Sequence, residues 1–396
     1  MGGTEMSEWK KVKLGELYEV HNGLSKGRQF FGSGYPFLSF STVFNNWFLP
    51  KELDSLVQSS DKEREACSVK KGDVFITRTS ETMDELGMSS IALQDYPNAT
   101  YNGFTKRLRP ITDMVVPEYI GYYLRSPKFR GKFMAFSTMT TRASLANGDL
   151  LSMEVELPEK EVQHRIATIL SRYDTLIENY QKQIKLLEEA AQRLYKEWFV
   201  DLHFPGHETT KIVDGLPEGW VKKTITEVFD FKYGKILPTK EFVSDGPIPV
   251  YGASKQIGRY TKANCFEPKV LVGSRGNAGF VHRTIENETY VTNNSFIVDP
   301  LSQYDYLKLP FIFESFKLMD FVAICTGAAQ PQLTLNSIAS LKYIVPLRKV
   351  IERFCDISSH YFENISMAYK QIRLLTEARD RLLTKLMNGE MEISNK

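Results

Sequence analysis

The sequence holds few of the residues that bind metals or form disulfides, with four cysteines and six histidines among 396 residues. The cysteines are far apart and form no C-x-x-C pair, which argues against a disulfide framework or a zinc ribbon and is typical of a reducing compartment. His203 and His207 are four residues apart, but a Pro-Gly pair between them prevents a helix from presenting both rings to one ion. We therefore expect no metal site.

Long apolar runs and an excess of one charge are also missing. No stretch of about 18 apolar residues occurs, so we expect no membrane-spanning helix. The beginning, MGGTEMSEWKKVKLGEL, lacks the apolar core of a signal peptide, and we expect a cytoplasmic protein. The 50 basic and 48 acidic side chains give a net charge of only +2. Any nucleic-acid-binding face would have to be formed by folding, which gathers basic side chains on one side.

The motifs of several enzyme classes are absent as well. There is no Walker A sequence, and SRGNAG at residues 274–279 lacks the spacing and the lysine of a phosphate-binding loop. We find no Asn-Pro-Pro-aromatic motif of a DNA methyltransferase, no carboxylate cluster for the Mg²⁺ of a nuclease and no G-x-S-x-G elbow. We predict that the chain is not an enzyme and binds no cofactor itself.

What the sequence does contain is an internal repeat with a period of about 200 residues, which is too long for a solenoid. Residues 9–23, WKKVKLGELYEVHNG, align without a gap with residues 220–234, WVKKTITEVFDFKYG, at an offset of 211. Further on, YPFLSF meets IPVYGA through Pro36 and Pro249. The pattern indicates two tandem copies of one unit.

The later part of each copy aligns at a different offset, 188. Pro158 meets Pro346, and QIKLL at residues 183–187 meets QIRLL at residues 371–375. The change in offset means that the first copy carries 23 extra residues, which we place in loops between about residues 24 and 120.

Two long helices are indicated by apolar residues that alternate every three and four positions for more than four heptads, a pattern typical of a coiled-coil seam. A proline precedes each helix, and Gly389 ends the second. An ordinary amphipathic helix in a bundle is the alternative, but two matched stripes favour mutual pairing. The residues that we predict to pair the helices are Ile166, Leu170, Tyr173, Ile177, Tyr180, Ile184, Leu187, Leu194, Phe354, Tyr361, Ile365, Ile372, Leu375, Leu382 and Leu386.

The segments before these helices are of mixed character. Short β-branched runs at residues 74–77, 270–273 and 290–298 alternate with aromatic-rich helical stretches such as residues 118–126. We predict an α+β fold with two tandem mixed α/β domains and two long helices. The predicted boundaries are 1–157 for the first domain, 158–203 for the first helix, 204–219 for a Pro- and Gly-containing linker, 220–346 for the second domain and 347–390 for the second helix and the C-terminal end.

Taken together, these segments resemble the specificity subunit of type I restriction–modification systems. The matching stretches are LPEGWVKKTITEVFDFKYGK at the start of the second copy, TGAAQPQLTLNSIASLKYIVPL near its end, and LPEKEVQHRIATILSRYDTLIENYQKQIKLLEEAAQRLYKEWFVDLHFPG through the first long helix. Each motif alone is loose, but their order and duplication are specific, and the resemblance covers nearly the whole chain.

The resemblance implies that each globular copy is a target-recognition domain that reads one half of an asymmetric, interrupted site in double-stranded DNA. It also implies that the two long helices pair antiparallel as a pseudo-two-fold spacer and that methyltransferase subunits dock around them and hold the methyl donor. A restriction (translocase) subunit is a further partner of such systems. The geometry agrees, because a helix of about 35 residues spans ~50 Å, or roughly 15 base pairs.

Candidate DNA contacts are Lys, Arg and small polar residues in loops, since these groups hydrogen-bond phosphates and base edges. VFITRT and VLVGSR resemble each other, and each carries an arginine near its end. In the first copy the candidates are Lys26, Arg28, Ser41, Thr42, Arg78, Thr79, Ser80 and Arg142. In the second copy they are Lys235, Lys240, Ser254, Lys255, Arg259, Ser274, Arg275, Asn277, Asn293, Asn294 and Gln330. For any one of them the alternative is a solvated surface side chain.

Two points stay open at the level of sequence. The first copy reads TRASL at residues 141–145 where the second reads AQPQL at residues 329–333, and the second is the better match to the resemblance. A coiled-coil scaffold whose globular domains bind protein explains the repeat and the helices equally well.

Neither globular copy is strongly basic, so we expect tight DNA binding to depend on assembly with methyltransferase subunits.

Overall fold

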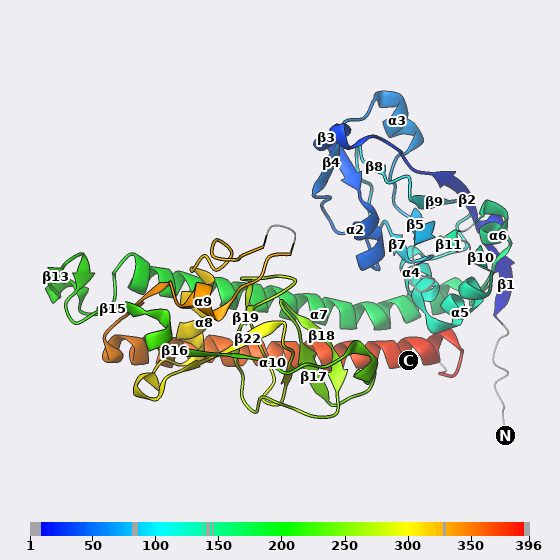
Figure 1. The fold of residues 1–396 in the computed structure, drawn as a ribbon. Coiled ribbons are helices and arrows are strands. Elements are labelled where there is room, and N and C mark those ends of the chain that lie inside the picture. Colours follow the sequence, from blue (N-terminus) through cyan, green and yellow to red (C-terminus); the bar gives the residue numbers. More distant parts are fainter. Residues whose placement is uncertain are drawn as a thin grey trace, which may run out of the picture. The chain divides into compact units, whose positions relative to one another are not determined.

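The computed structural model describes residues 9–80, 86–136, 138–139, 143–144, 146–327 and 330–391 (Figure 1). The chain forms two compact units. The first unit is Met1–Leu176 together with Leu375–Lys396, and the second unit is Ile177–Leu374. Each unit contains a globular α/β part and one segment of each long helix, so these units divide the chain within the helices instead of at the predicted domain boundaries.

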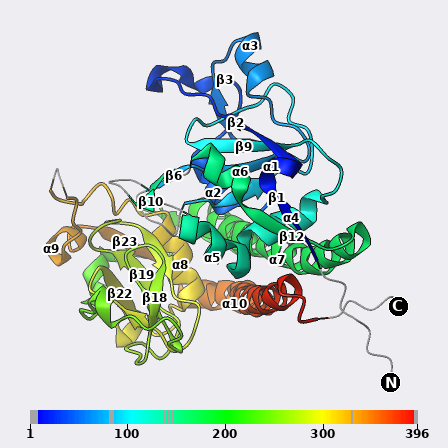
Figure 2. The ribbon, with the colours of Figure 1, turned by 90° about the vertical axis from the view of Figure 1, so that its right-hand side faces the viewer.

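The first unit is built around a four-stranded antiparallel sheet with the order β2-β9-β5-β7. A second sheet has the order β4-β3-β8, in which β3 and β8 run parallel, and a third pairs β1 with β12 (Figure 2). A small sheet with the order β10-β11-β6 completes the unit. The strands are β1 (Lys10–Lys13), β2 (Tyr18–Asn22), β3 (Phe31–Leu38), β4 (Ser55–Val57), β5 (Val74–Thr77), β6 (Thr79–Ser80), β7 (Ser89–Ile91), β8 (Thr100–Tyr101), β9 (Thr105–Pro110), β10 (Thr138–Met139), β11 (Ala143–Ser144) and β12 (Glu154–Leu157).

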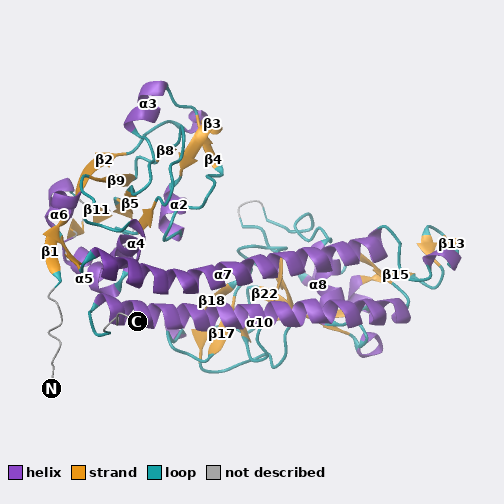
Figure 3. Ribbon diagram, turned by 180° about the vertical axis from the view of Figure 1, so that it is seen from behind, coloured by secondary structure: helices purple, strands orange, loops and turns teal. Residues whose placement is uncertain are grey.

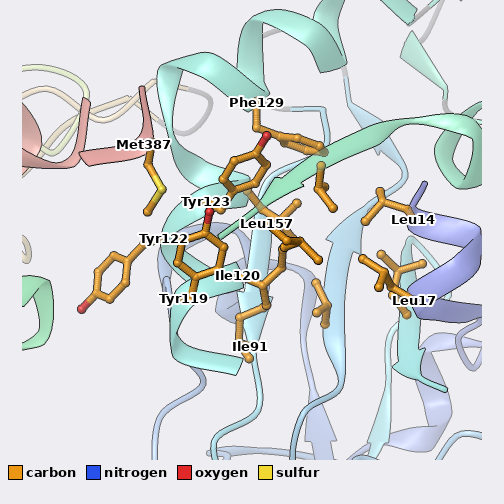
Figure 4. Close-up of a cluster of buried hydrophobic side chains, with 14 of the residues drawn as sticks. Leu14, Leu17, Ile91, Tyr119, Ile120, Tyr122, Tyr123, Phe129, Leu157 and Met387 are labelled. Carbon is orange, nitrogen blue, oxygen red and sulfur yellow. The ribbon is translucent and has the colours of Figure 1, made fainter. Parts of the chain in front are cut away.

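Short helices cover the main sheet of the first unit. The helix α4 starts with Pro117 at its first turn, where the missing N–H costs nothing, and its buried face carries Tyr119, Tyr122 and Tyr123 (Figure 4). Burial of each of these large rings stabilises the fold by roughly 2 kcal/mol. The helical elements are α1 (Leu14–Leu17), η1 (Arg28–Phe30), α2 (Phe40–Asn45), α3 (Asp61–Ala66), α4 (Pro117–Arg125), α5 (Pro127–Phe136) and α6 (Asn147–Ser152).

The second unit repeats this arrangement. Its main sheet has the order β16-β22-β19-β20, a second sheet has the order β18-β17-β21 with β17 and β21 parallel, and a third pairs β15 with β23. A hairpin of β13 and β14 lies in the segment predicted as linker. The strands are β13 (Ile212–Val213), β14 (Leu216–Pro217), β15 (Val221–Thr224), β16 (Phe229–Tyr233), β17 (Ile248–Tyr251), β18 (Gln256–Tyr260), β19 (Val270–Gly273), β20 (Val281–Arg283), β21 (Tyr290–Val291), β22 (Ser295–Pro300) and β23 (Lys342–Val345). The short helices are η3 (His207–Thr209), η4 (Ile225–Glu227), η5 (Thr239–Glu241), η6 (Ser302–Tyr304), α8 (Leu309–Lys317) and α9 (Leu335–Ile338).

The duplicated topology confirms the predicted α+β fold of two tandem domains. Most of the extra residues of the first copy lie between β3 and β5, where they form α2 and α3. One prediction was wrong in detail, because the run at residues 290–298 is not one strand. It is divided into β21 and β22 by a turn in which the Ser295 N–H donates to the Thr292 carbonyl, and the two strands belong to different sheets.

The two long helices are α7 (Lys160–Tyr195), which continues as the π-helical turn η2 (Lys196–Val200), and α10 (Arg348–Met387). The first helix was predicted over residues 158–203 without this change of winding. Gly389 follows α10 in the left-handed conformation, with φ of +72°, as predicted for a residue that ends a helix.

In each unit the two helices lie side by side and antiparallel (Figure 3). In the first unit Asp174 of α7 contacts Arg379 of α10, and in the second unit Ile184 shares a buried cluster with Ile365 and Ala368. All fifteen residues predicted to pair the helices are buried or half-buried. The stripe missed Phe362, whose ring packs on Phe313 of α8 at 5.8 Å, because α10 also packs against the globular part of the second unit.

Candidate nucleic-acid interface

In the second unit, most of the predicted contact residues lie at one edge of the main sheet. The strands β16 and β19 end where the antiparallel strand β22 begins, so their loops meet there. The Ser274 N–H donates to the Asn294 carbonyl at 2.7 Å, and the Asn293 N–H donates to the Lys235 carbonyl at 3.2 Å. Backbone hydrogen bonds therefore hold the three loops together.

Two further segments join the same edge. The Asn277 amide donates to the Ser254 hydroxyl at 2.7 Å, which connects the β17–β18 turn to the loop after β19. Arg275 forms a β-bridge with Gln332, and the Leu333 N–H donates to the Ser274 carbonyl at 3.0 Å. The second edge, as we call it, consists of residues 234–235, 252–255, 274–277, 292–294, 326–327 and 330–332.

The side chains of the second edge differ in how they meet the solvent. The exposed residues among those predicted are Lys235, Lys255, Arg275, Asn277, Asn294 and Gln330. Ser254 and Asn293 are half-buried. Lys240 is exposed as well, in η5 and outside the second edge as defined.

Two side chains of the second unit that were predicted to contact DNA are engaged within the protein. Ser274 is only 1% exposed, and its hydroxyl donates to the Asn293 carbonyl at 3.1 Å, so it supports the loop from inside. The guanidinium of Arg259 donates to the carbonyls of Gly246 and Pro247 and thereby fastens the segment before β17. The prediction was therefore wrong for Ser274, which is not placed to contact DNA, while Arg259 is half-buried.

The first unit has an equivalent edge, formed by the loops after β2 and β5 and the turn before β9. The Arg78 N–H donates to the Phe104 carbonyl at 2.9 Å, and the Gly103 N–H donates to the Leu24 carbonyl at 2.8 Å. The first edge, as we call it, consists of residues 23–28, 78–80 and 102–104. Arg28 is exposed and Arg78 is half-buried.

Five other candidates of the first unit lie in β6, in α2 or outside the described residues. Thr79 and Ser80 form β6, which pairs with β11, and the structure describes their backbone alone. Arg142 lies outside the described residues. Ser41 and Thr42 are in the first turn of α2, where both hydroxyls are within 2.9 Å of the Ser39 hydroxyl, so they belong to the N-terminal cap of that helix.

Lys26, predicted as a DNA contact, is half-buried and engaged within the protein. Its amine donates to the Gln58 carbonyl at 2.9 Å and forms an ion pair with Glu63 at 2.9 Å. The hydrogen bond from Lys26, followed by that from the Ser60 N–H, lowers the pKa of the Glu63 carboxyl to about 2. The lysine therefore ties the first edge to α3.

The two arginines noted in the sequence do not occupy equivalent positions. In β5 Thr77 pairs with Thr105, and in β19 Gly273 pairs with Ser295. Because these pairs correspond, Arg78 is equivalent to Ser274, and Arg275 is one residue further along. Arg78 and Arg275 therefore extend from different backbone positions of the two edges.

A glycine shared by the two copies has a steric role at both edges. A Cβ atom on Gly23 would be 2.2 Å from the Asn102 carbonyl oxygen, and one on Gly234 would be 2.3 Å from the Thr292 carbonyl oxygen. Only glycine permits such a close crossing of two backbones. The two copies therefore share a glycine at the end of the gap-free alignment of residues 9–23 with residues 220–234.

Sequence reasoning missed one residue of the first edge and one beside it in β9. Phe104 is 56% exposed at the turn before β9, and Lys106, two residues later, is 5% exposed with its amine bonded to the Asn147 side chain. Burial, followed by repulsion from Arg78, lowers the pKa of Lys106. The sequence pattern that predicts DNA contacts is a hydrogen-bonding side chain in a loop, and an exposed phenylalanine or a lysine inside a strand does not fit it.

Two classes of site were not found within the part of the chain that the structure describes. No group of three or more His, Cys, Asp or Glu side chains there is arranged to hold a metal ion. None of the described helices combines the length and the apolar composition that are needed to cross a bilayer.

Comparison with known proteins gives the family. The model of the type I restriction modification DNA specificity domain matches the chain twice, over residues 6–189 and 217–366. The chain belongs to this family. Its two specificity domains correspond to the two structural copies, and membership assigns the chain to the recognition component of restriction–modification systems and not to a catalytic one.

Individual relatives of these specificity domains are distant in sequence and similar in length. The MjaIX type I restriction enzyme specificity subunit of Methanocaldococcus jannaschii is 24% identical, with 99% of this chain and 95% of the relative covered. The HindI specificity subunit of Haemophilus influenzae is also 24% identical, with 98% and 100% covered. The crystal structure of a type I restriction–modification system S subunit from M. genitalium has the same fold, with a TM-score of 0.56, 17% identity and 98% of each chain covered.

Proposed function

We propose that this chain reads an asymmetric, bipartite site in double-stranded DNA, with the first edge at one half-site and the second edge at the other. The observation that carries the proposal is the repeated sheet edge, where backbone hydrogen bonds position loops that display different side chains in the two copies. Different side chains on one scaffold would read two different half-sites, because base edges are recognised by individual donors, acceptors and apolar groups.

The long helices would set the spacing of the two half-sites. Their lengths, 36 residues in α7 and 40 in α10, correspond to roughly 55 and 60 Å at 1.5 Å per residue. The exposed faces of the helices would dock methyltransferase subunits, and those subunits would bind the methyl donor. A restriction subunit would be the further partner. Such a complex works on the DNA of its own cell, in the cytoplasm.

The experiment is single-molecule sequencing of native genomic DNA from the host, with and without this gene. We expect deletion to abolish adenine methylation at one asymmetric motif interrupted by a fixed gap. Complementation with the wild-type gene should restore the same motif. An unchanged methylation map, while the methyltransferase subunits are expressed, would contradict DNA recognition and favour a protein-binding scaffold.

A further inference from the structure

Phe104 and Asn294 occupy equivalent positions at the two edges. Phe104 directly precedes β9, and Asn294 directly precedes β22. The Phe104 carbonyl accepts the Arg78 N–H at 2.9 Å, and the Asn294 carbonyl accepts the Ser274 N–H at 2.7 Å. The position held by this main-chain hydrogen bond therefore carries an aromatic ring in one copy and an amide in the other.

The backbone around Phe104 is fixed at both of its polar groups. Its N–H donates to the side-chain oxygen of Asn102 at 2.7 Å, and the Thr105 N–H closes the turn on the Asn102 carbonyl at 3.0 Å. A ring held in this way and left 56% exposed is a preorganised contact group, since little backbone entropy is lost when a partner covers it.

The surroundings of Phe104 indicate what that partner is. The half-buried Arg78 is hydrogen-bonded to it through the backbone. Lys106, two residues away on β9, is buried and its amine is bonded to Asn147, so Arg78 is the cation that a partner can reach. Among the described residues Arg78 forms no ion pair with a carboxylate. An exposed apolar ring beside a partly exposed arginine fits nucleic acid, where arginine meets phosphates and apolar side chains meet thymine methyl groups or base steps.

Asn294 has the complementary chemistry. Its side chain is exposed and makes no hydrogen bond within the described part of the chain, while its carbonyl is held by the loop after β19. An asparagine amide offers a donor and an acceptor together, the pair that matches the major-groove edge of adenine. Arg275, an exposed cation of the second edge, is adjacent because its N–H also donates to the Asn294 carbonyl, at 3.4 Å.

We propose that Phe104 and Asn294 are base-contacting, specificity-determining residues of the two half-sites, Phe104 through apolar contact and Asn294 through hydrogen bonds. The inference rests on the proposed function and adds the chemistry by which each half-site is read. The half-site of the first copy is read at this position by shape and methyl groups, and that of the second copy by donors and acceptors.

The test is performed on the assembled complex. The full chain is expressed with its methyltransferase subunits in a host that lacks the system, and methylated adenines are mapped by single-molecule sequencing. We expect Phe104→Ala to relax one position of one half of the motif, with methylation of sites altered there rising about tenfold or more. We expect Asn294→Ala to relax the other half, and each variant to leave the opposite half unchanged.

Matched controls distinguish this result from a general weakening. Ile111→Ala removes an apolar side chain of similar exposure, 58%, at the opposite end of β9 from Phe104. Gln303→Ala removes an exposed amide in η6, beyond the opposite end of β22 from Asn294. Both controls should leave the motif as in wild type.

The outcomes separate this inference from the proposed function. Should the wild-type chain produce no new methylated motif, the proposed function fails. If wild type produces the motif and both alanine variants keep it unchanged, the function stands and the inference is overturned. Should Phe104→Ala abolish all methylation, Phe104→Leu decides: retention of the motif by this apolar substitute supports the contact, and loss of both halves overturns it.

Discussion

Asp174 of α7 and Arg379 of α10 form an ion pair at 2.6 Å, and the hydroxyl of Tyr122 donates to the other carboxylate oxygen at 2.5 Å. Both charged side chains are largely shielded, with 22% and 12% of their surface exposed. The guanidinium also lies 4.5 Å from the ring of Trp47. One carboxylate thus joins both long helices to α4 within the first unit.

Loss of this carboxylate should destabilise the first unit. We expect Asp174→Ala to lower the free energy of unfolding by about 2 kcal/mol, because Arg379 and Tyr122 lose their shared acceptor in a shielded place. Urea denaturation measures the change. Lys182→Ala, which removes an ion pair to Glu178 at 4.0 Å between two exposed side chains, should cost no more than about 0.5 kcal/mol. Equal effects of the two variants would contradict the prediction.

The two shared glycines should tolerate no side chain. Gly23→Ala and Gly234→Ala place a methyl group against a backbone carbonyl, and we expect each to destabilise its unit by about 2 kcal/mol or more. Thermal unfolding of the full chain measures the effect. Gly131→Ala is the control: its Cβ meets nothing within 4 Å in α5, so it should instead stabilise by roughly 0.5–1 kcal/mol. The same sign for all three would refute the steric explanation.

His282 makes the stability of the second unit depend on pH. Burial lowers its pKa from 6.5 to about 4, so between these values the unfolded chain binds a proton that the folded chain does not. Stability therefore falls as pH decreases through 6.5 toward 4, by about 2 kcal/mol at pH 5. Urea denaturation at pH 7 and pH 5 should show this loss, and His282→Gln should reduce it. His360→Gln, at an exposed position, should leave the loss as in wild type.

The cations of the second edge should act differently on DNA. We expect Arg275→Ala in the assembled complex to lower affinity for the recognised site by about tenfold or more and to relax one position. Lys255→Ala should weaken binding to all sequences and reduce the salt dependence by about one counterion. Titration at several salt concentrations tests both. Lys262→Ala, at an exposed position beyond the opposite end of β18, is the control and should change neither quantity.

The fold was largely predictable, since its signals are local or repeated. The apolar stripes of α7 and α10 follow from helix geometry, and the shared glycine follows from the close backbone crossing. Both features occur in each copy, so the sequence contains each signal twice. The candidate interface was predicted less well. The roles of Lys26 and Ser274 depend on which distant groups fold against them, Gln58 and Glu63 in one case and Asn293 in the other.

The hydrogen bonds that hold Phe104 and Asn294 from the strands beside them run between main-chain atoms, which every residue except proline can provide. A change of side chain at either position therefore alters the exposed surface, while the main-chain hydrogen bonds around it persist. Stability and target choice are thereby decoupled at this point, so that new recognition properties can be acquired by single mutations with little risk of misfolding.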